Sequence, residues 1–155
     1  MALEIERKFL IDHTKWHALQ KPEGKLYRQG YLLNDEMKTI RVRVSNEAAF
    51  ITIKGKTTGV TRSEFEYEIP LTDGIQLLDN FSVSEISKTR YEIYQHSKLW
   101  EVDVFHGSNE GLIVAEIELN SETEIFELPD WIIEEVTHDA KYYNSNLSVT
   151  PFKLW

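Results

Sequence analysis

The sequence has no cysteine among its 155 residues, which excludes disulfide bonds, cysteine-ligated metal sites and thiol nucleophiles. No apolar run approaches the ~20 residues of a membrane-spanning helix, and the charged N-terminal stretch lacks the apolar core of a signal peptide. Positive charge is also in deficit, with 17 basic against 26 acidic residues. Because counterion release rewards a basic surface, this deficit argues against a nucleic-acid or acidic-membrane partner. Taken together, these absences predict a soluble, cytoplasmic protein.

The length corresponds to a single domain, residues 1–155, at roughly 150 residues per domain. The dominant pattern is an alternation of apolar and polar residues with a period of two, which places successive side chains on opposite faces of a β-strand. We predict strands at Leu3–Ile11, Tyr27–Leu33, Thr39–Val44, Ala49–Lys54, Thr61–Leu71, Ser87–Tyr94, Leu99–Phe105 and Ile113–Leu119. Short turn-like connections favour antiparallel neighbours.

Helical patterns are fewer. Asp12 or His13 opens a predicted short helix that ends at Gln20, and Thr72 opens another that ends near Phe81. The run from Ser121 to Glu124 has the spacing of a capping box, which is typical of a helix start. The segment after Pro129 and Asp130 has an amphipathic, helix-like pattern. The predicted fold class is α+β, with a mostly antiparallel sheet.

Charged residues alternate along these strands and are sorted by sign from strand to strand. The acidic pairs are Glu4/Glu6, Glu64/Glu66, Glu101/Asp103 and Glu116/Glu118, and the basic residues in phase are Lys8, Arg41, Arg43, Lys54, Lys88 and Arg90. Two structures fit this pattern: a half-buried sheet with a charged solvent face, or a barrel whose charged faces point into a polar lumen. The periodicity alone does not decide between them.

The recurring Glu-x-Glu spacing aims two carboxylates at one volume. Two such pairs that converge would repel each other unless a hard cation lay between them, and all-oxygen sites suit Mg²⁺ or Mn²⁺. Neighbouring arginines and lysines would then suit the phosphate groups that such a metal bridges.

The order of these motifs resembles the CYTH superfamily, also called triphosphate tunnel metalloenzymes. The first strand carries the Glu-x-Glu-x-Lys signature at Glu4, Glu6 and Lys8, and companion motifs follow in family order over almost the whole chain. They are Arg28–Leu32, Arg41–Arg43, Thr52–Lys54, Glu64–Glu66, Lys88–Tyr91, Glu101–Phe105, Glu116–Glu118 and Glu135–Tyr142. The resemblance is greatest to the short bacterial inorganic triphosphatases. It implies a closed antiparallel β-barrel of about eight strands with flanking helices, whose tunnel binds triphosphate and a divalent metal.

The resemblance also implies roles for individual residues. The implied metal-binding group is Glu4, Glu6, Glu64, Asp103, Glu116 and Glu118. The implied triphosphate-binding group is Lys8, Arg41, Arg43, Lys54, Lys88 and Arg90. Lys8, Arg43 and Glu66 are the implied catalytic residues. Arg7 lies out of phase and is expected to be structural, and Lys141 is expected to reach the tunnel mouth.

The predicted reaction is metal-dependent hydrolysis of inorganic triphosphate to pyrophosphate and phosphate, with Mg²⁺ or Mn²⁺ as cofactor. The alternatives are an adenylate cyclase that converts ATP to cyclic AMP and pyrophosphate, a hydrolase of organic triphosphates such as thiamine triphosphate, and a binding module without chemistry. The expected partner is a small-molecule triphosphate. The apolar C-terminal stretch Phe152–Trp155 indicates either a homodimer contact or a tail folded onto the barrel.

Overall fold

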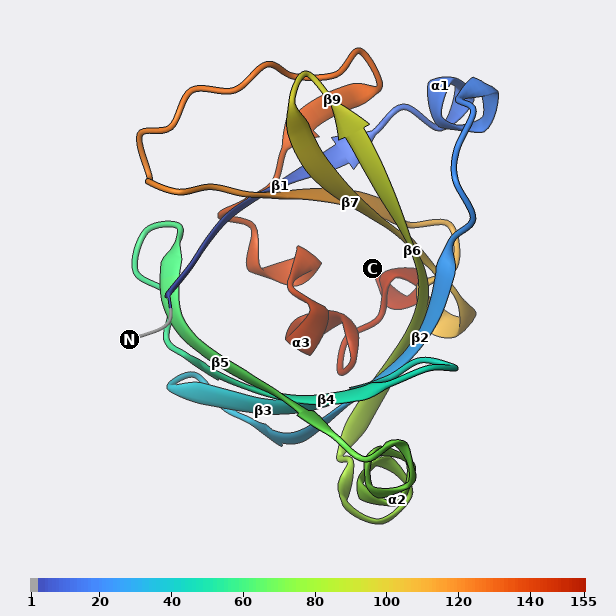
Figure 1. Ribbon diagram of the computed structural model, residues 1–155, viewed down its shortest axis with the longest axis vertical. Helices are drawn as coiled ribbons and strands as arrows, with labels where there is room; N and C mark the ends of the chain where they lie inside the picture. The colour runs from blue at the N-terminus through green and yellow to red at the C-terminus, as the bar shows by residue number, and fades with distance from the viewer. Residues whose placement is uncertain (1–2) are drawn as a thin grey trace.

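The computed structural model describes residues 3–155, so the first two residues of the predicted domain lie outside the described chain. Its strands form one antiparallel sheet (Figure 1). They are β1 (Leu3–Ile11), β2 (Lys25–Asn34), β3 (Lys38–Val44), β4 (Ala49–Gly55), β5 (Thr61–Ile69), β6 (Ser84–Gln95), β7 (Lys98–Phe105), β8 (Ile113–Glu118) and β9 (Ile132–Glu135). The eight predicted strands correspond to β1–β8.

The sheet closes on itself because β1 pairs with three other strands. The strand order is β5-β4-β3-β2-β6-β7-β8-β1-β9, and β1 also pairs back with β5. Along this seam Glu4 lies opposite Arg62, whereas the following residues of β1 pair with β8. The predicted closed barrel of eight antiparallel strands is thereby confirmed. β9 is an additional strand that pairs with β1 on the edge opposite β8.

Within residues 3–155, three α-helices flank the barrel: α1 (His13–Ala18), α2 (Leu71–Phe81) and α3 (Asn144–Leu147). Single 3-10 turns lie at η1 (Gly107–Asn109), η2 (Ala140–Tyr142) and η3 (Phe152–Leu154). Asp12 caps α1 by accepting a hydrogen bond from the Lys15 backbone N–H. Gly74 lets α2 approach the outside of the barrel closely, since a Cβ there would lie 2.5 Å from the Ala49 methyl group. No helix within residues 3–155 is long and apolar enough to cross a membrane.

The main apolar core lies on the outer face of β1, β6, β7 and β8, where α1 and the β8–β9 connection cover it. Trp100 stacks edge-on against Phe9 and Trp131, with ring centroids 5.6 and 5.8 Å apart. Trp16 from α1 joins the same cluster. Because this face of the sheet is filled with aromatic groups, the opposite face of the same strands is left to line the lumen.

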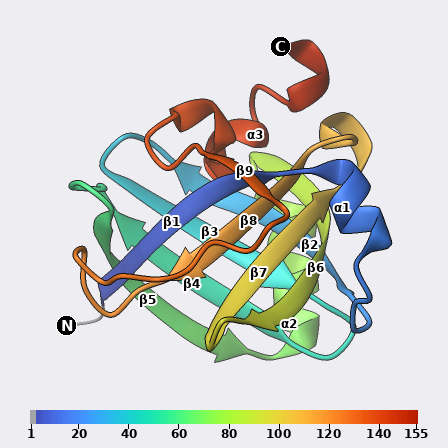
Figure 2. The same ribbon diagram turned by 90° about the horizontal axis from the view of Figure 1, so that it is seen from above.

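The C-terminal segment lies across one end of the barrel, as Figures 1 and 2 show for α3. The Asn34 side-chain amide donates to the Ser145 carbonyl at 3.0 Å, and the hydroxyls of Ser84 and Ser148 lie 2.8 Å apart. The tail then folds back on its own chain, with the Trp155 ring 5.1 Å from those of Tyr142 and Phe152. Of the two expectations for Phe152–Trp155, the structure has the folded tail, and the homodimer stays a prediction.

Two helix predictions are wrong. The segment after Asp130 forms β9 instead, because its backbone pairs with the free edge of β1 near Phe9 and Ile11. No helix begins at Ser121: the Glu124 carboxylate accepts a hydrogen bond from the Asn120 backbone N–H at 2.6 Å, and the chain then continues without regular secondary structure, with Phe126 packed on Trp100. Tertiary pairing and packing thus override a local helical pattern in both segments.

Candidate active site

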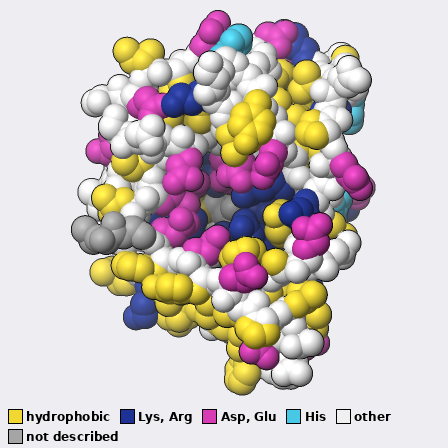
Figure 3. Space-filling model, in the orientation of Figure 1, with side chains coloured by type: hydrophobic (Ala, Val, Ile, Leu, Met, Phe, Trp, Pro, Cys, Tyr) yellow, Lys and Arg dark blue, Asp and Glu magenta, His cyan; other side chains and the backbone are white. Residues whose placement is uncertain are grey.

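The inward faces of the barrel strands carry the charged residues. Lys8 is buried in the lumen, whereas its neighbour Phe9 is buried in the outer core. In Figure 3, acidic and basic side chains surround a hollow at the centre of the molecule. The cavity there is lined by Glu4, Glu6, Lys8, Tyr31, Thr39, Arg41, Lys54, Thr57, Gly59, Val60, Arg62, Thr137, Tyr143, Asn144 and Ser145. Of the two structures that the alternation left open, the chain adopts the barrel with the polar lumen.

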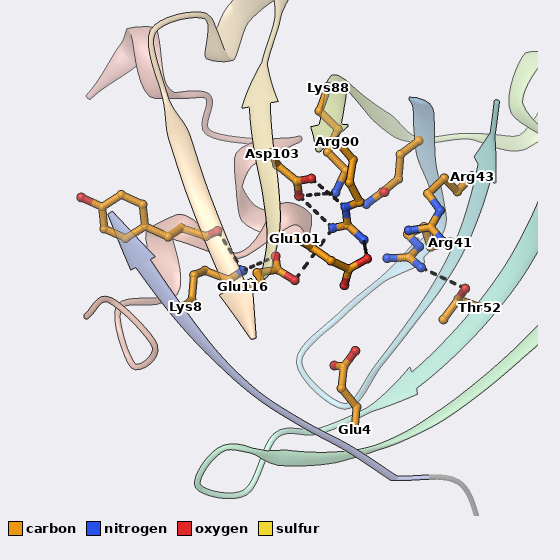
Figure 4. A network of polar contacts seen from close by, with 12 residues as sticks. Glu4, Lys8, Arg41, Arg43, Thr52, Lys88, Arg90, Glu101, Asp103 and Glu116 are labelled. Atoms are coloured by element: carbon orange, nitrogen blue, oxygen red, sulfur yellow. Dashed lines mark hydrogen bonds and ion pairs between the residues drawn. The ribbon is translucent and has the colours of Figure 1, made fainter. Parts of the chain in front are cut away.

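Asp103 on β7 is the centre of one ion-paired group, which we call the Asp103 cluster (Lys88, Arg90, Glu101, Asp103 and Glu116; Figure 4). The Arg90 guanidinium donates to both Asp103 oxygens, at 2.7 and 2.9 Å. The Lys88 ammonium donates to Asp103 Oδ2 at 2.9 Å. The side chains of Lys88 and Asp103 are 0% and 1% exposed, so this ion pair at the centre of the cluster is removed from solvent.

The charges in the Asp103 cluster determine its protonation states. Burial would raise the pKa of Asp103, but the charges of Arg90 and Lys88 lower it. Burial likewise opposes ionisation of Glu116, yet the Lys8 and Arg90 charges hold its pKa well below the usual range. Burial lowers the pKa of Lys88 to about 7 despite its ion pair with Asp103. A buried lysine with this pKa would gain a proton readily beside an incoming anion.

Lys8 connects the Asp103 cluster to the C-terminal segment. Its ammonium lies 3.5 Å from Glu116 Oε1, donates to the Tyr142 carbonyl at 3.4 Å and lies 5.6 Å from the centre of the Tyr143 ring. Its backbone N–H donates to Thr137 Oγ1 at 3.0 Å. Lys8 is therefore held from two sides.

A second group, the Glu4 cluster (Glu4, Glu6, Lys54, Arg62 and Glu64), lies at the β1–β5 seam. The Lys54 ammonium donates to both Glu4 oxygens, at 2.8 and 3.0 Å, and lies 3.3 Å from Glu64. Arg62 Nε donates to Glu4 Oε1 at 3.2 Å. Although burial alone would raise the pKa of Glu4, the Lys54 charge holds it well below the usual range.

The other carboxylates of this region repel one another. Burial, together with the charges of Glu116 and Glu4, raises the pKa of Glu6 to about 8. Burial and the neighbouring Glu4 raise the pKa of Glu64 to about 7. Glu6 also lies directly opposite Glu118 in the β1–β8 register, and burial followed by the Glu4 charge raises the pKa of Glu118. Facing like charges destabilise a strand pair. The raised pKa values of these carboxyl groups therefore indicate an excess of negative charge in this region.

The basic wall, formed by Arg41 and Arg43 on β3, has an excess of positive charge. Arg41 donates to Thr52 Oγ1 at 3.0 Å and to Glu66 at 3.4 Å, and Arg43 lies 3.9 Å from Glu66. The Nε atoms of Arg41 and Arg43 are buried and have no hydrogen-bond partner within residues 3–155. Burial, followed by the charges of Arg41 and Arg90, lowers the pKa of Arg43. Unpaired buried donors are costly and rare, so these two Nε atoms keep unused capacity to donate hydrogen bonds.

The residues present fit a hard divalent cation through the chemistry of their donors. Glu4, Glu6, Glu64 and Glu118 offer only carboxylate oxygens, which suit Mg²⁺ or Mn²⁺, and the raised pKa values of Glu6 and Glu64 show that nearby protein cations do not balance their charge. Among the described residues, no three acidic or histidine side chains converge into a preformed metal site.

Asp103 fits a metal less well than the other predicted ligands, because Arg90 and Lys88 already occupy its oxygens. Glu66 is likewise engaged, since it accepts from Thr52 at 2.9 Å and from Arg41. The remaining predicted residues face the same lumen. Their metal-binding, triphosphate-binding and catalytic roles stay predictions.

Two residues outside the lumen had separate predictions. Arg7 lies on the outer face, where it forms a two-point ion pair with Glu135, as expected for a structural residue. Lys141 does not line the lumen cavity: it is exposed, and its ammonium lies 4.5 Å from the Trp155 ring and 5.3 Å from that of Tyr142. The expectation that Lys141 reaches the tunnel mouth is therefore wrong, because the folded tail holds it outside.

Arg62 is the main lumen residue that the sequence interpretation missed. It lines the cavity and contacts Glu4. Its signal was available, because Arg62 is in phase with Glu64 and Glu66 and precedes them on the same strand. Tyr143 and Asn144 also line the cavity, but they come from a segment without periodicity.

The fold and the site together define a small closed barrel with a charged, ion-paired lumen. Comparison with known proteins gives the family: the model of the CYTH domain matches residues 2–150, and the chain belongs to the CYTH family.

Among characterised proteins, an inorganic triphosphatase of Acetivibrio thermocellus is 46% identical over 154 residues, which cover 99% of this chain and 97% of the relative. An inorganic triphosphatase of Nitrosomonas europaea is 34% identical over 155 residues, covering 95% and 97%. A solved structure of an inorganic triphosphatase superposes with a TM-score of 0.64 at 32% identity, covering 96% of each chain.

Proposed function

We propose that this protein hydrolyses inorganic triphosphate to pyrophosphate and phosphate in its barrel lumen, with Mg²⁺ or Mn²⁺ as cofactor. The observation that carries the proposal is the basic wall, where the Nε donors of Arg41 and Arg43 are buried and have no hydrogen-bond partner within residues 3–155. The names and nearly full-length similarity of the two relatives support the same reaction.

The basic side chains of the lumen are proposed to bind the phosphate groups. Arg41, Arg43 and Lys54 would bind phosphate oxygens from one side of the lumen, and Lys8, Lys88 and Arg90 from the other. Preorganised cations of this kind stabilise the charge that spreads over the transferring phosphoryl group, and no covalent enzyme intermediate is required. One phosphoanhydride P–O bond breaks, and the oxygen of a water molecule takes its place on phosphorus.

The carboxylates are proposed to hold the metal and to orient the water. Glu4, Glu6, Glu64, Glu116 and Glu118 would hold the metal, which when bound supplies Lewis-acid stabilisation of phosphate oxygens. Glu66 holds Arg41 and Arg43 in position, and this contact is its proposed catalytic contribution. Asp103 orients Arg90 and Lys88 rather than binding the metal.

The test is release of phosphate and pyrophosphate from tripolyphosphate, ATP and thiamine triphosphate, with Mg²⁺, with Mn²⁺ and with EDTA. We expect metal-dependent release that is fastest from tripolyphosphate. Arg43→Gln should lower turnover by about 10²–10³-fold, as loss of other preorganised charge-stabilising groups does. Arg28→Gln is the matched control, because Arg28 pairs with Glu85 and Asp79 outside the lumen and should keep full activity.

Other outcomes would contradict the proposal in different ways. Pyrophosphate from ATP with cyclic AMP, and without orthophosphate, would identify a cyclase. Fastest turnover of thiamine triphosphate would identify a hydrolase of organic triphosphates. No turnover of any compound, together with tight binding of tripolyphosphate, would identify a binding module.

A further inference from the structure

Arg62 is a lumen cation outside the six residues that the family motifs implied for triphosphate binding. It lies on β5 directly opposite Glu4 of β1, at the seam where the barrel closes. Among the cations that line the cavity, its side chain is the most exposed, at 25% against 8% for Lys8, 9% for Arg41 and 11% for Lys54. Arg62 is therefore the cavity cation most accessible to a ligand that arrives from solvent.

Arg62 and Lys54 together occupy the carboxylate of Glu4. Lys54 lies within 3.0 Å of both Glu4 oxygens, and Arg62 Nε lies 3.2 Å from Oε1. A divalent cation that binds Glu4 would add a double positive charge to this group. At these separations repulsion between like charges is strong, so at least one of the two side chains must withdraw from Glu4.

Lys54 and Arg62 differ in whether they have an acidic partner besides Glu4. Lys54 has a second acidic partner, since its ammonium lies 3.3 Å from Glu64. Arg62 has no ion-pair partner other than Glu4 within residues 3–155. The charges of Glu4 and Glu6 oppose the effect of burial and raise the pKa of Arg62, so the guanidinium stays charged. When a metal engages Glu4, Arg62 becomes the unpaired cation of the cavity.

We propose that Arg62 is a further triphosphate-binding residue that Glu4 holds in the metal-free protein and releases to a phosphate group when a divalent metal binds Glu4. This inference rests on the proposed function. Arg62 would then couple the two ligands: the metal makes an additional phosphate donor available, and the bound triphosphate keeps that donor away from Glu4. Linkage requires the coupling to be reciprocal, so each ligand tightens the other.

The test compares Arg62→Gln with the wild type in two measurements. The first is a Mn²⁺ titration followed by electron paramagnetic resonance, without triphosphate. Removal of the competing cation should tighten Mn²⁺ binding by about fivefold, the size expected for a partly exposed ion pair. The second is the KM for tripolyphosphate at saturating Mn²⁺, which should rise by about tenfold or more because a charge-assisted hydrogen bond is lost, with a smaller change in kcat.

Two controls separate this role from a structural one. Arg62→Lys keeps the charge but not the forked geometry, so its Mn²⁺ affinity should stay close to that of the wild type and its KM should rise less than that of Arg62→Gln. Arg28→Gln removes an ion-paired arginine outside the lumen and should change neither measurement. Thermal unfolding of each variant shows whether the fold is retained.

Tighter Mn²⁺ binding is a result that damage to the site would not produce. Weaker Mn²⁺ binding by Arg62→Gln would overturn the inference, because Arg62 would then support Glu4 as a ligand rather than compete with the metal. An unchanged KM would overturn it as well. If the wild type does not hydrolyse triphosphate, the proposed function fails, and the Mn²⁺ titration still decides whether Arg62 competes for Glu4.

Discussion

The Asp103 cluster and the Glu4 cluster line the same lumen and consist of the same residue types, yet they differ in balance. In the Asp103 cluster one buried carboxylate receives hydrogen bonds from Arg90 and Lys88, and the charges of these two residues lower its pKa. In the Glu4 cluster, by contrast, the pKa of Glu6 is raised to about 8 and that of Glu64 to about 7.

The difference separates charges that hold the barrel together from charges that remain available to a ligand. A buried charge is tolerated when its hydrogen-bonding capacity is filled from within the protein, as at Asp103. Carboxylates that repel one another keep part of that capacity for a cation from outside. The two clusters should therefore respond differently to substitution, to removal of metal and to pH.

The largest expected effect is on stability at the Asp103 cluster. Asp103→Ala leaves Lys88 and Arg90 buried without their carboxylate, and breaking a buried ion pair in this way costs about 3–5 kcal/mol. Urea unfolding of the metal-free protein measures the change. Glu118→Gln is the control: Glu118 is exposed at the C-terminal end of β8, and the free energy of unfolding of this variant should stay within about 0.5 kcal/mol of the wild type. An equal loss for both variants would contradict the distinction.

The second effect is on turnover at the Glu4 cluster. Glu6→Gln should lower metal-dependent turnover by about 10²–10³-fold without lowering stability, because it removes a carboxylate that faces Glu118 and is repelled by Glu116. Glu4→Gln should lower both, since it also leaves Lys54 and Arg62 without their shared partner. Steady-state kinetics and urea unfolding of both variants check the contrast. A Glu6→Gln protein with full activity would refute the assignment of Glu6 to the metal.

The third effect is a pH dependence that belongs to Glu6. In the unfolded chain this group ionises near its ordinary pKa of 4.5, whereas in the folded, metal-free protein it keeps its proton up to about pH 8. The folded state therefore binds more protons in this window, and Glu6 makes the free energy of unfolding fall as the pH rises from about 4.5 to about 8. The free energies of unfolding of the wild type and of Glu6→Gln, both measured in EDTA, should differ by an amount that increases toward pH 8. A difference that stays constant with pH would refute the raised pKa of Glu6.

The strands could be predicted from the sequence because their signal is local. Alternation along β1, β3 and β5 follows from the two-residue repeat of an extended chain, and each of the eight predicted segments forms a barrel strand. The wrong predictions lie where distant contacts decide the backbone: β9 pairs with β1, and the connection after Ser121 is fixed by the packing of Phe126 on Trp100. The ion pairs of the lumen were equally beyond local reasoning. Glu4 meets Arg62 across 58 positions of sequence, so this ion pair became visible only at the closed seam.

By itself the sequence determined which residues share a strand face, and therefore that glutamates, lysines and arginines gather on one side of each strand. Only the tertiary structure decided that this side is the lumen, and which carboxylate meets which cation. The physical reason is that side-chain periodicity is a property of each strand alone, whereas the distance between two charges depends on strand order, register and closure. The unpaired donors of Arg41 and Arg43 and the crowded carboxylate of Glu6 exist only because the sheet closes around them.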